Sequence, residues 1–242
     1  MSLILHQFPI SHYCEKVRWA LDHKGLAYQA KNYLPGLHLK KIRRMARRSS
    51  VPVLEHDGHF VQGSAEILSY LDEQFPEHPL TPGDPALRER ALEIERFFDR
   101  EVGPHVRRFC YDTLLEHPRV VVPLLAQGGP FWARPLLYLV FPKLKSLMRR
   151  TMTIREPEVS ESRQALEEAL QRLPEMLDGG DYLAGEHFSR ADMAAASMLA
   201  PLFMPPGYGL QWPQRVPEPL ASWIAEHRQG LAWAERIRAR HR

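Results

Sequence analysis

Apolar residues follow two different spacings along this chain of 242 residues. Up to about residue 75, short apolar or alternating runs are interleaved with runs at helical spacing, whereas after residue 85 only helical spacing recurs. The stretch between them, "PEHPLTPGDP" (76–85), holds four prolines and a glycine and therefore indicates a linker. The pattern predicts a mixed α/β domain over residues 1–75 and an all-helical domain over residues 86–242.

The first domain reads as the element order βαβαββα. A strand in "LILHQF" leads to a helix over residues 12–24, which Gly25 ends, and "AYQAKNYL" forms a second strand. A basic helical stretch follows, and then "VPVLEHDGHFVQG" alternates apolar residues across Asp57-Gly58, a strong hairpin signal. The last helix has apolar residues at helical spacing: Ile67, Leu68, Leu71 and Phe75.

The second part contains only helical patterns. One apolar helix face is expected from Leu87, Ala91, Ile94, Phe98 and Val102, and another from Leu166, Leu170, Leu173 and Leu177. Further helices are predicted over residues 131–152, 190–200 and 219–239. In "FSRADM", Ser189 and Asp192 have the spacing of a capping box, with Phe188 placed to staple onto Met193.

Composition narrows the class of protein. A hydrophobic fraction of 44% and a charged fraction of 25% are typical of a globular protein, and a net charge of +3 gives no reason to expect nucleic acid. Two cysteines form no disulfide framework. The chain lacks a secretory signal and a long membrane-spanning apolar run, so we expect a cytoplasmic protein.

Two polar clusters have ordinary explanations. The run "KKIRRMARR" (40–48) places six basic residues in nine, which favours a solvated amphipathic helix; the alternatives are a surface that steers glutathione or another anion, or one that contacts nucleic acid. His56 and His59 flank the hairpin turn without a third ligand, so we expect no metal site.

Several short motifs occur together in a fixed order. "SHYCEKVR" follows the first strand, "VPVL" precedes the hairpin, "GSAEILSYL" follows it, and "FSRAD" lies in the helical domain beyond the proline-rich linker. In this order the chain resembles the cytosolic glutathione S-transferase family over nearly its whole length. The resemblance implies a thioredoxin-like first domain, a helical second domain, glutathione as cosubstrate and a homodimer.

The resemblance also implies a glutathione-binding edge in the first domain. The backbone of Val51 would pair with the peptide-like ligand, with a cis bond before Pro52, and Ser64 at a helix start would receive the γ-glutamyl carboxylate. If no ligand binds there, Val51 and Pro52 belong to an ordinary edge strand and Ser64 is an ordinary helix cap. Gly63 replaces a residue that is usually acidic in the family, and Glu66 can substitute for it only if its side chain turns toward the site.

Ser11 and Cys14 begin the first helix and are the two candidate catalytic residues. Ser11 occupies the family position that faces the glutathione sulfur, where a hydroxyl and a helix start would stabilise a thiolate; otherwise it only caps the helix. Cys14 corresponds to the second cysteine of a CxxC pair whose first cysteine is absent. Its spacing with Val17 and Leu21 favours a packed thiol, and the alternative is a mixed disulfide with glutathione.

The sequence gives weaker indications for the glycine end of glutathione and for the pocket of the acceptor substrate. His38 and Lys40 are candidates for the glycine carboxylate of glutathione. The apolar stretch over residues 120–150 favours a wall of a hydrophobic acceptor pocket, and its basic end suits a membrane surface as the alternative. Candidate lining residues are Tyr111, Phe131, Trp132 and Tyr138.

The sequence therefore predicts a glutathione transferase that adds the glutathione thiolate to a hydrophobic electrophile. Two alternatives stay open. One is a glutathione-dependent thiol reductase that uses Cys14, and the other is a noncatalytic binding protein, for which Gly63 is the main indication.

Overall fold

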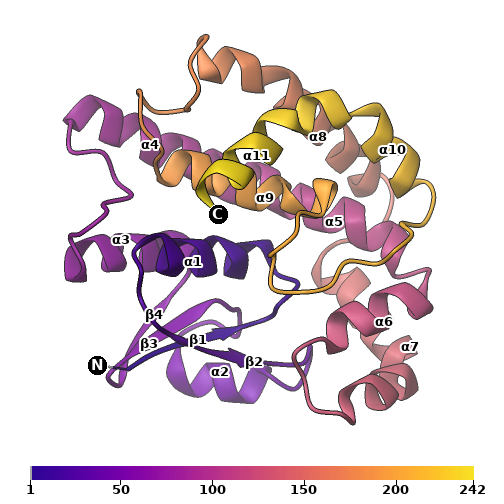
Figure 1. Ribbon diagram of the computed structural model, residues 1–242. Coiled ribbons are helices and arrows are strands. Elements are labelled where there is room, and N and C mark those ends of the chain that lie inside the picture. The colour runs from indigo at the N-terminus through magenta and orange to yellow at the C-terminus, as the bar shows by residue number, and fades with distance from the viewer. Residues whose placement is uncertain (1) are drawn as a thin grey trace.

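A computed structural model describes residues 2–242 and contains one four-stranded sheet with helices on both faces (Figure 1). The strands β1 (Leu3–Gln7), β2 (Gln29–Asn32), β3 (Val53–His56) and β4 (His59–Gln62) lie in the order β2-β1-β3-β4. β1 is parallel to β2 and antiparallel to β3, and β3 pairs with β4 across the predicted hairpin. Asp57 and Gly58 both have positive φ, as a tight two-residue hairpin turn requires.

Three helices cover the sheet and complete the predicted βαβαββα order. These are α1 (His12–His23), α2 (Leu39–Met45) and α3 (Ser64–Gln74). α2 packs on one face of the sheet through the fully buried Ile42, which clusters with Tyr33 and Val53. α1 and α3 contact each other on the opposite face, where α1 also contacts the helical domain. The fold class predicted from the sequence is confirmed.

The rest of the chain is helical, and Figure 1 shows its helices stacked above and beside the first domain. The predicted helices over 131–152 and 190–200 are present, and the second extends to residue 203. The helical elements are α4 (Pro85–Phe97), η1 (Phe98–Val102), α5 (Gly103–Leu114), α6 (Pro118–Ala126), α7 (Ala133–Thr151), α8 (Glu158–Leu177), α9 (Arg190–Phe203), α10 (Leu220–Glu226) and α11 (Arg228–His241).

The single helix predicted over residues 219–239 is wrong, because α10 and α11 are separate helices that meet at His227. The His227 ring nitrogen Nδ1 bonds to the carbonyl oxygen of Trp223 at 2.8 Å, and the two side chains stack. The Trp223 carbonyl thus accepts hydrogen bonds from both the backbone N–H of His227, at 3.1 Å, and its side chain, an interaction that His side chains near a helix C-terminus can make. The capping box of α9 is confirmed, with both the Ser189 and Asp192 side chains bonded to backbone N–H groups.

α4, η1 and α5 form one rod with a wide π-helical turn at η1. Pro104 in the first turn of α5 has no N–H to donate to the carbonyl of Arg100, so the regular ladder is interrupted there. Ala91, Ile94, Phe98 and Val102 are buried on the predicted apolar face, whereas Leu87 at its start is 36% exposed. The wide turn places Asp99 and Arg100 opposite α3.

Candidate functional site

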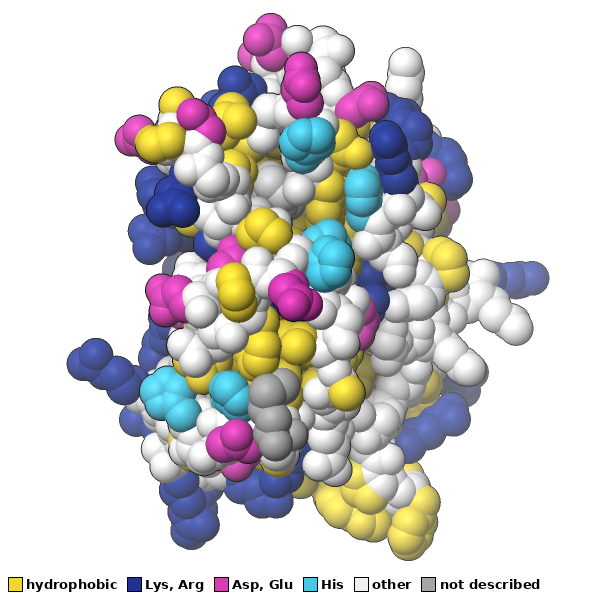
Figure 2. All heavy atoms as spheres, turned by 60° about the vertical axis from the view of Figure 1, so that its left-hand side comes forward, with side chains coloured by type: hydrophobic (Ala, Val, Ile, Leu, Met, Phe, Trp, Pro, Cys, Tyr) yellow, Lys and Arg dark blue, Asp and Glu magenta, His cyan; other side chains and the backbone are white. Residues whose placement is uncertain are grey.

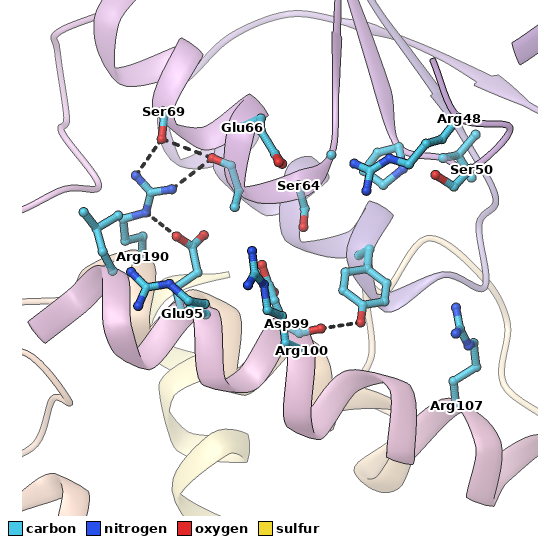
Figure 3. A pocket seen from close by; sticks show the side chains of 17 residues that line it. Arg48, Ser50, Ser64, Glu66, Ser69, Glu95, Asp99, Arg100, Arg107 and Arg190 are labelled. Carbon is cyan, nitrogen blue, oxygen red and sulfur yellow. Dashed lines mark hydrogen bonds and ion pairs between the residues drawn. The ribbon is translucent and has the colours of Figure 1, made fainter. Parts of the chain in front are cut away.

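A cleft of about 520 Å³ lies between the start of α3 and the α4–η1–α5 rod (Figure 3). It is lined by four of the six residues that the sequence assigned to glutathione binding: Val51, Pro52, Gly63 and Ser64. The bond between Val51 and Pro52 is cis, as predicted, and the Gly63 N–H donates to the Pro52 carbonyl at 3.2 Å. We call this space the polar cleft.

The start of α3 supplies the polar groups on one side of the polar cleft. Ser64 is the first residue of α3, where a hydroxyl lies beside the backbone N–H groups of the first helical turn, an arrangement that generally favours an anion. Gly63 has a φ of 109°, and a Cβ atom there would collide with the carboxylate of Glu66. The Glu66 side chain therefore occupies the space that an acidic side chain at position 63 would use, and it lines the cleft.

Arginines dominate the charge of the polar cleft. Five arginines line it against three carboxylates, and Figure 3 shows Arg48 and Arg100 pointing into it from opposite walls. Arg190 is paired with Glu95 at 2.7 Å. Within residues 2–242, no ion pair engages the other four: Arg48, Arg96, Arg100 and Arg107. The cleft thus carries excess positive charge toward any ligand.

A second cavity of about 380 Å³, here called the apolar cavity, adjoins the polar cleft. Tyr13, Ser50, Val51 and Arg107 line both spaces, so the two meet at these residues. Its remaining walls come from the first domain and from α5, α6 and α7. Its apolar lining includes Phe8, Ile10, Tyr111, Leu125, Leu144, Leu147 and Met148.

Ser11 lines the apolar cavity at the start of α1. Its hydroxyl accepts a hydrogen bond from the Cys14 N–H at 3.4 Å, so it caps α1 and still presents its side chain to the cavity. The backbone N–H groups of the first turn of α1 add a favourable field for a negative charge at this point. The structure therefore brings Ser11 to the cavity that adjoins Val51.

Cys14 lies elsewhere. Its side chain is fully buried, it lines neither the polar cleft nor the apolar cavity, and burial raises the pKa of its thiol. A buried thiol with a raised pKa is a poor nucleophile. This placement matches the packed role that its spacing with Val17 and Leu21 predicted.

Two neighbours of Ser11 were not expected from the sequence. His12 is buried, and burial together with the charges of Arg107 and Lys16 lowers its pKa to about 3, so the ring is neutral. The Tyr13 hydroxyl donates to the backbone carbonyl of Asp99 at 2.6 Å, and burial raises the pKa of Tyr13 to about 12. Neither side chain is in a form suited to accept a proton near neutral pH.

The structure places the two residues predicted to bind the glycine carboxylate in different surroundings. His38 lines the apolar cavity, with its ring edge-on against Phe8 at 4.7 Å. Lys40 is exposed on α2 and lines neither the polar cleft nor the apolar cavity. Only His38 is therefore within the assembled site.

Only one of the four side chains predicted to line the acceptor pocket lines the apolar cavity. Tyr111 lines the apolar cavity as expected. Phe131, Trp132 and Tyr138 do not line it, and they are 95%, 44% and 38% exposed, so this part of the prediction is wrong. Helical periodicity explains the difference, because α7 turns Leu144, Leu147 and Met148 toward the cavity and carries Tyr138 on another face.

A buried ion network supports the floor of the polar cleft. The Lys16 ammonium on α1 contacts Glu95 at 3.1 Å and Asp99 at 2.5 Å, and Glu95 also binds Arg190. Burial opposes the charge of Lys16, but the two carboxylates outweigh it and raise the pKa of Lys16. Arg190 also donates to the carbonyl of Ala65 at 2.9 Å, so the network fixes the first turn of α3.

A metal cluster and a membrane-spanning helix are two further kinds of site to consider among residues 2–242. Residues 2–242 contain no cluster of three or more His, Cys, Asp or Glu side chains arranged to hold a metal ion. No helix in the same range is both long and apolar enough to cross a membrane.

The fold and site define a protein with a thioredoxin-like domain, a helical domain and a ligand cleft between them. Residues 5–79 match the model of the "Glutathione S-transferase, N-terminal domain", and residues 136–218 match that of the "Glutathione S-transferase, C-terminal domain". The chain belongs to the glutathione S-transferase family.

Individual relatives are distant. Glutathione S-transferase 1 of Dianthus caryophyllus is 38% identical over 94 residues, which cover 38% of this chain and 42% of that protein. FtsZ-localized protein A of Caulobacter vibrioides is 26% identical over 200 residues, covering 81% of this chain and 75% of that protein. The match to the Dianthus protein thus spans less than half of its length.

A solved structure shows the same fold. The glutathione S-transferase of Methylobacterium radiotolerans, in complex with glutathione sulfonate, superposes with a TM-score of 0.66 at 21% identity. The superposition covers 99% of this chain and 92% of that one. Identity this low shows the shared fold alone.

Three arginines of the polar cleft are functional candidates that the sequence did not indicate. Arg96, Arg100 and Arg107 come from the α4–η1–α5 rod, far along the chain from the motifs around Ser11 and Ser64. Arginine at a helix surface usually faces solvent, so nothing local distinguishes these residues. Only their position opposite α3 and β3 reveals them.

Proposed function

We propose that this protein is a glutathione transferase that adds the glutathione thiolate to a hydrophobic electrophile. The observation that carries the proposal is the junction at Val51 and Arg107, where the polar cleft meets the apolar cavity. A polar peptide in one space and an apolar acceptor in the other would meet with their reacting atoms at that junction. Holding two reactants in this way is itself a large part of catalysis.

Glutathione suits the polar cleft by charge. It carries two carboxylates, one ammonium and a thiol. The γ-glutamyl carboxylate would lie at Ser64 and the first turn of α3, while the ammonium would lie at Glu66. The backbone of Val51 would pair with the cysteinyl residue and direct its thiol toward the junction. The unpaired arginines would attract this anionic ligand.

The reaction begins when the bound thiol loses its proton to water. The hydroxyl of Ser11 would donate a hydrogen bond to the thiolate, and the start of α1 and the Arg107 guanidinium would add positive potential. The thiolate then forms a C–S bond with the electrophilic carbon. At an aryl halide, the halide leaves with the bonding electron pair; at an activated alkene, the carbon next to the attacked one takes a proton from water.

Direct binding and turnover measurements test this proposal. Calorimetry is expected to show glutathione binding, and a panel of an aryl halide, an activated alkene and an epoxide is expected to reveal turnover of at least one member. Binding without any turnover would instead support the noncatalytic alternative, and absence of binding would remove the proposed site. The same proposal includes a homodimer, as in the family it resembles.

The position of the Glu66 carboxylate gives a specific prediction. Glu66→Gln is expected to weaken glutathione binding roughly three- to tenfold, because an exposed charge pair with the ligand ammonium contributes about 1 kcal/mol. The matched control is Glu73→Gln, also exposed on α3 but outside the cleft, which should leave the dissociation constant unchanged. Calorimetry measures the glutathione dissociation constant of the wild type and of both variants. Equal dissociation constants for all three proteins would contradict the role of Glu66.

A further inference from the structure

Exposed apolar side chains concentrate in two segments of the described chain. Six of the seven large hydrophobic residues that are exposed within residues 2–242 lie either just before or at the start of α2, or from the α6–α7 turn into α7. Phe131 is 95% exposed, Leu139 is 81% exposed and Leu37 is 57% exposed. The other three of the six are Leu39, Trp132 and Tyr138.

The two segments are neighbours in space. Leu39 from the first and Leu144, Leu147 and Met148 from α7 line the apolar cavity together. In Figure 1, α2 and the α6–α7 pair lie at the same lower end of the molecule. Figure 2 shows Lys and Arg side chains and a group of hydrophobic side chains projecting from that end. The exposed apolar residues therefore belong to the face that also contains walls of the apolar cavity.

All charged residues in and around these two segments are basic. Residues 33–50 and 118–151 contain twelve Lys and Arg residues and no Asp or Glu, although the whole chain has a net charge of only +3. Lys145 and Arg149 pair with Glu116, at the end of the neighbouring turn. No ion pair within residues 2–242 neutralises the exposed cations Lys40, Lys41, Arg43, Arg44, Arg134, Lys143 and Arg150.

We propose that this face, formed by residues 33–50 and 118–151, docks onto an anionic lipid surface. Exposed aromatic and leucine side chains partition into the headgroup region of a bilayer, and flanking Lys and Arg residues are attracted to anionic headgroups. Phe131, Trp132 and Leu139 supply the first component, and the unpaired cations of α2 and α7 supply the second.

Charge and hydrophobicity together favour lipid over the other partners. A second copy of this face would bring twelve cations against twelve, so docking of the face on itself is disfavoured. Nucleic acid would satisfy the cations but would leave Phe131 and Leu139 in water. Docking would also turn a wall of the apolar cavity toward the membrane, the phase in which hydrophobic compounds concentrate.

Vesicle binding of the purified full chain tests the proposal without reference to catalysis. Vesicles of phosphatidylcholine with about a third phosphatidylserine are expected to bind the protein at least tenfold more tightly than vesicles of phosphatidylcholine alone. Salt at roughly 0.5 M should weaken this binding severalfold by screening. Equal binding to the two kinds of vesicle, or binding to neither, would overturn the proposal.

Substitutions on this face, compared with control substitutions elsewhere, test whether this face binds the vesicles. Phe131→Ser combined with Leu139→Ser, and separately Arg43→Glu combined with Arg44→Glu, should each lower vesicle binding at least tenfold. The controls are Leu87→Ser on α4 and Arg163→Glu on α8, which are exposed elsewhere and should change it less than twofold. Because all these side chains are exposed, the variants are expected to fold, and circular dichroism checks this. Equal losses in the test and control variants would contradict the assignment.

Two further readouts separate lipid from the alternative partners. Brominated lipids should quench tryptophan fluorescence in the wild type, and Trp132→Phe should abolish most of that quenching. A mass that rises with protein concentration beyond that of the proposed homodimer, and that no longer does so in the Phe131→Ser, Leu139→Ser variant, would show self-association through this face instead. Tighter binding to duplex DNA than to anionic vesicles, unchanged in the same variant, would also overturn the proposal.

Discussion

Glu95→Gln is expected to lower the free energy of unfolding by about 3–5 kcal/mol. Glu95 is 2% exposed and holds two buried cations at once, Lys16 from α1 and Arg190 from α9. A neutral amide would leave Arg190 without its carboxylate and Lys16 with Asp99 alone. Uncompensated buried charge is costly, and the loss is a large part of the stability of an ordinary domain.

Urea unfolding followed by circular dichroism measures this effect. Arg163→Gln serves as the control, because it removes an exposed pair with Glu167 on α8 and should change stability by less than about 0.5 kcal/mol. A Glu95→Gln protein within about 1 kcal/mol of wild type would show that the network is not a main source of stability. Because Arg190 also binds Ala65, loss of the network should loosen the start of α3 and weaken glutathione binding as well.

Ser11→Ala is expected to lower turnover with a reactive electrophile by roughly ten- to a thousandfold, equivalent to about 1.4–4 kcal/mol. The physical reason is loss of the hydroxyl that would donate to the glutathione thiolate. Ser11 also caps α1 through the Cys14 N–H, so the substitution costs about 1 kcal/mol of stability as well. Turnover is therefore compared only after each variant is shown to be folded.

Two companion variants separate catalysis from capping and packing. Ser11→Thr keeps a hydroxyl and should retain much of the activity. Cys14→Ser places a polar group on a fully buried face and should act mainly through stability. A folded Ser11→Ala protein with wild-type turnover would remove the catalytic assignment. A folded Cys14→Ser protein without activity, together with a glutathione adduct on Cys14 in the wild type, would favour the reductase.

Local signals explain which parts of the fold were predictable. The hairpin at Asp57-Gly58 and the capping box at Ser189 each depend on a few adjacent residues, and both are present. The wide turn at η1 follows the missing N–H of Pro104, and α10 ends where the His227 side chain also bonds to the Trp223 carbonyl; neither feature interrupts the apolar periodicity. Periodicity alone therefore predicted too continuous a helical domain.

In the candidate site, too, residues in local motifs were predictable and residues from distant helices were not. Val51, Pro52, Gly63 and Ser64 lie in short motifs of one domain, and the structure brings them together in the polar cleft. Arg107 joins that cleft to the apolar cavity from a distant helix, which no local pattern indicates. The outward placement of Phe131 was likewise unpredictable, because an apolar residue before a helix carries no information about which side meets solvent.

The central claim is that the junction beside Ser11 holds glutathione as a thiolate, and ultraviolet titration of the bound thiol tests it most directly. A free thiol has a pKa of about 8.5, and a reduction by two units requires about 2.7 kcal/mol of preferential thiolate stabilisation. We predict a bound-thiol pKa about two units below the free value in the wild type, and a rise toward the free value in Ser11→Ala. A bound thiol that titrates like free glutathione in the wild type would contradict the account.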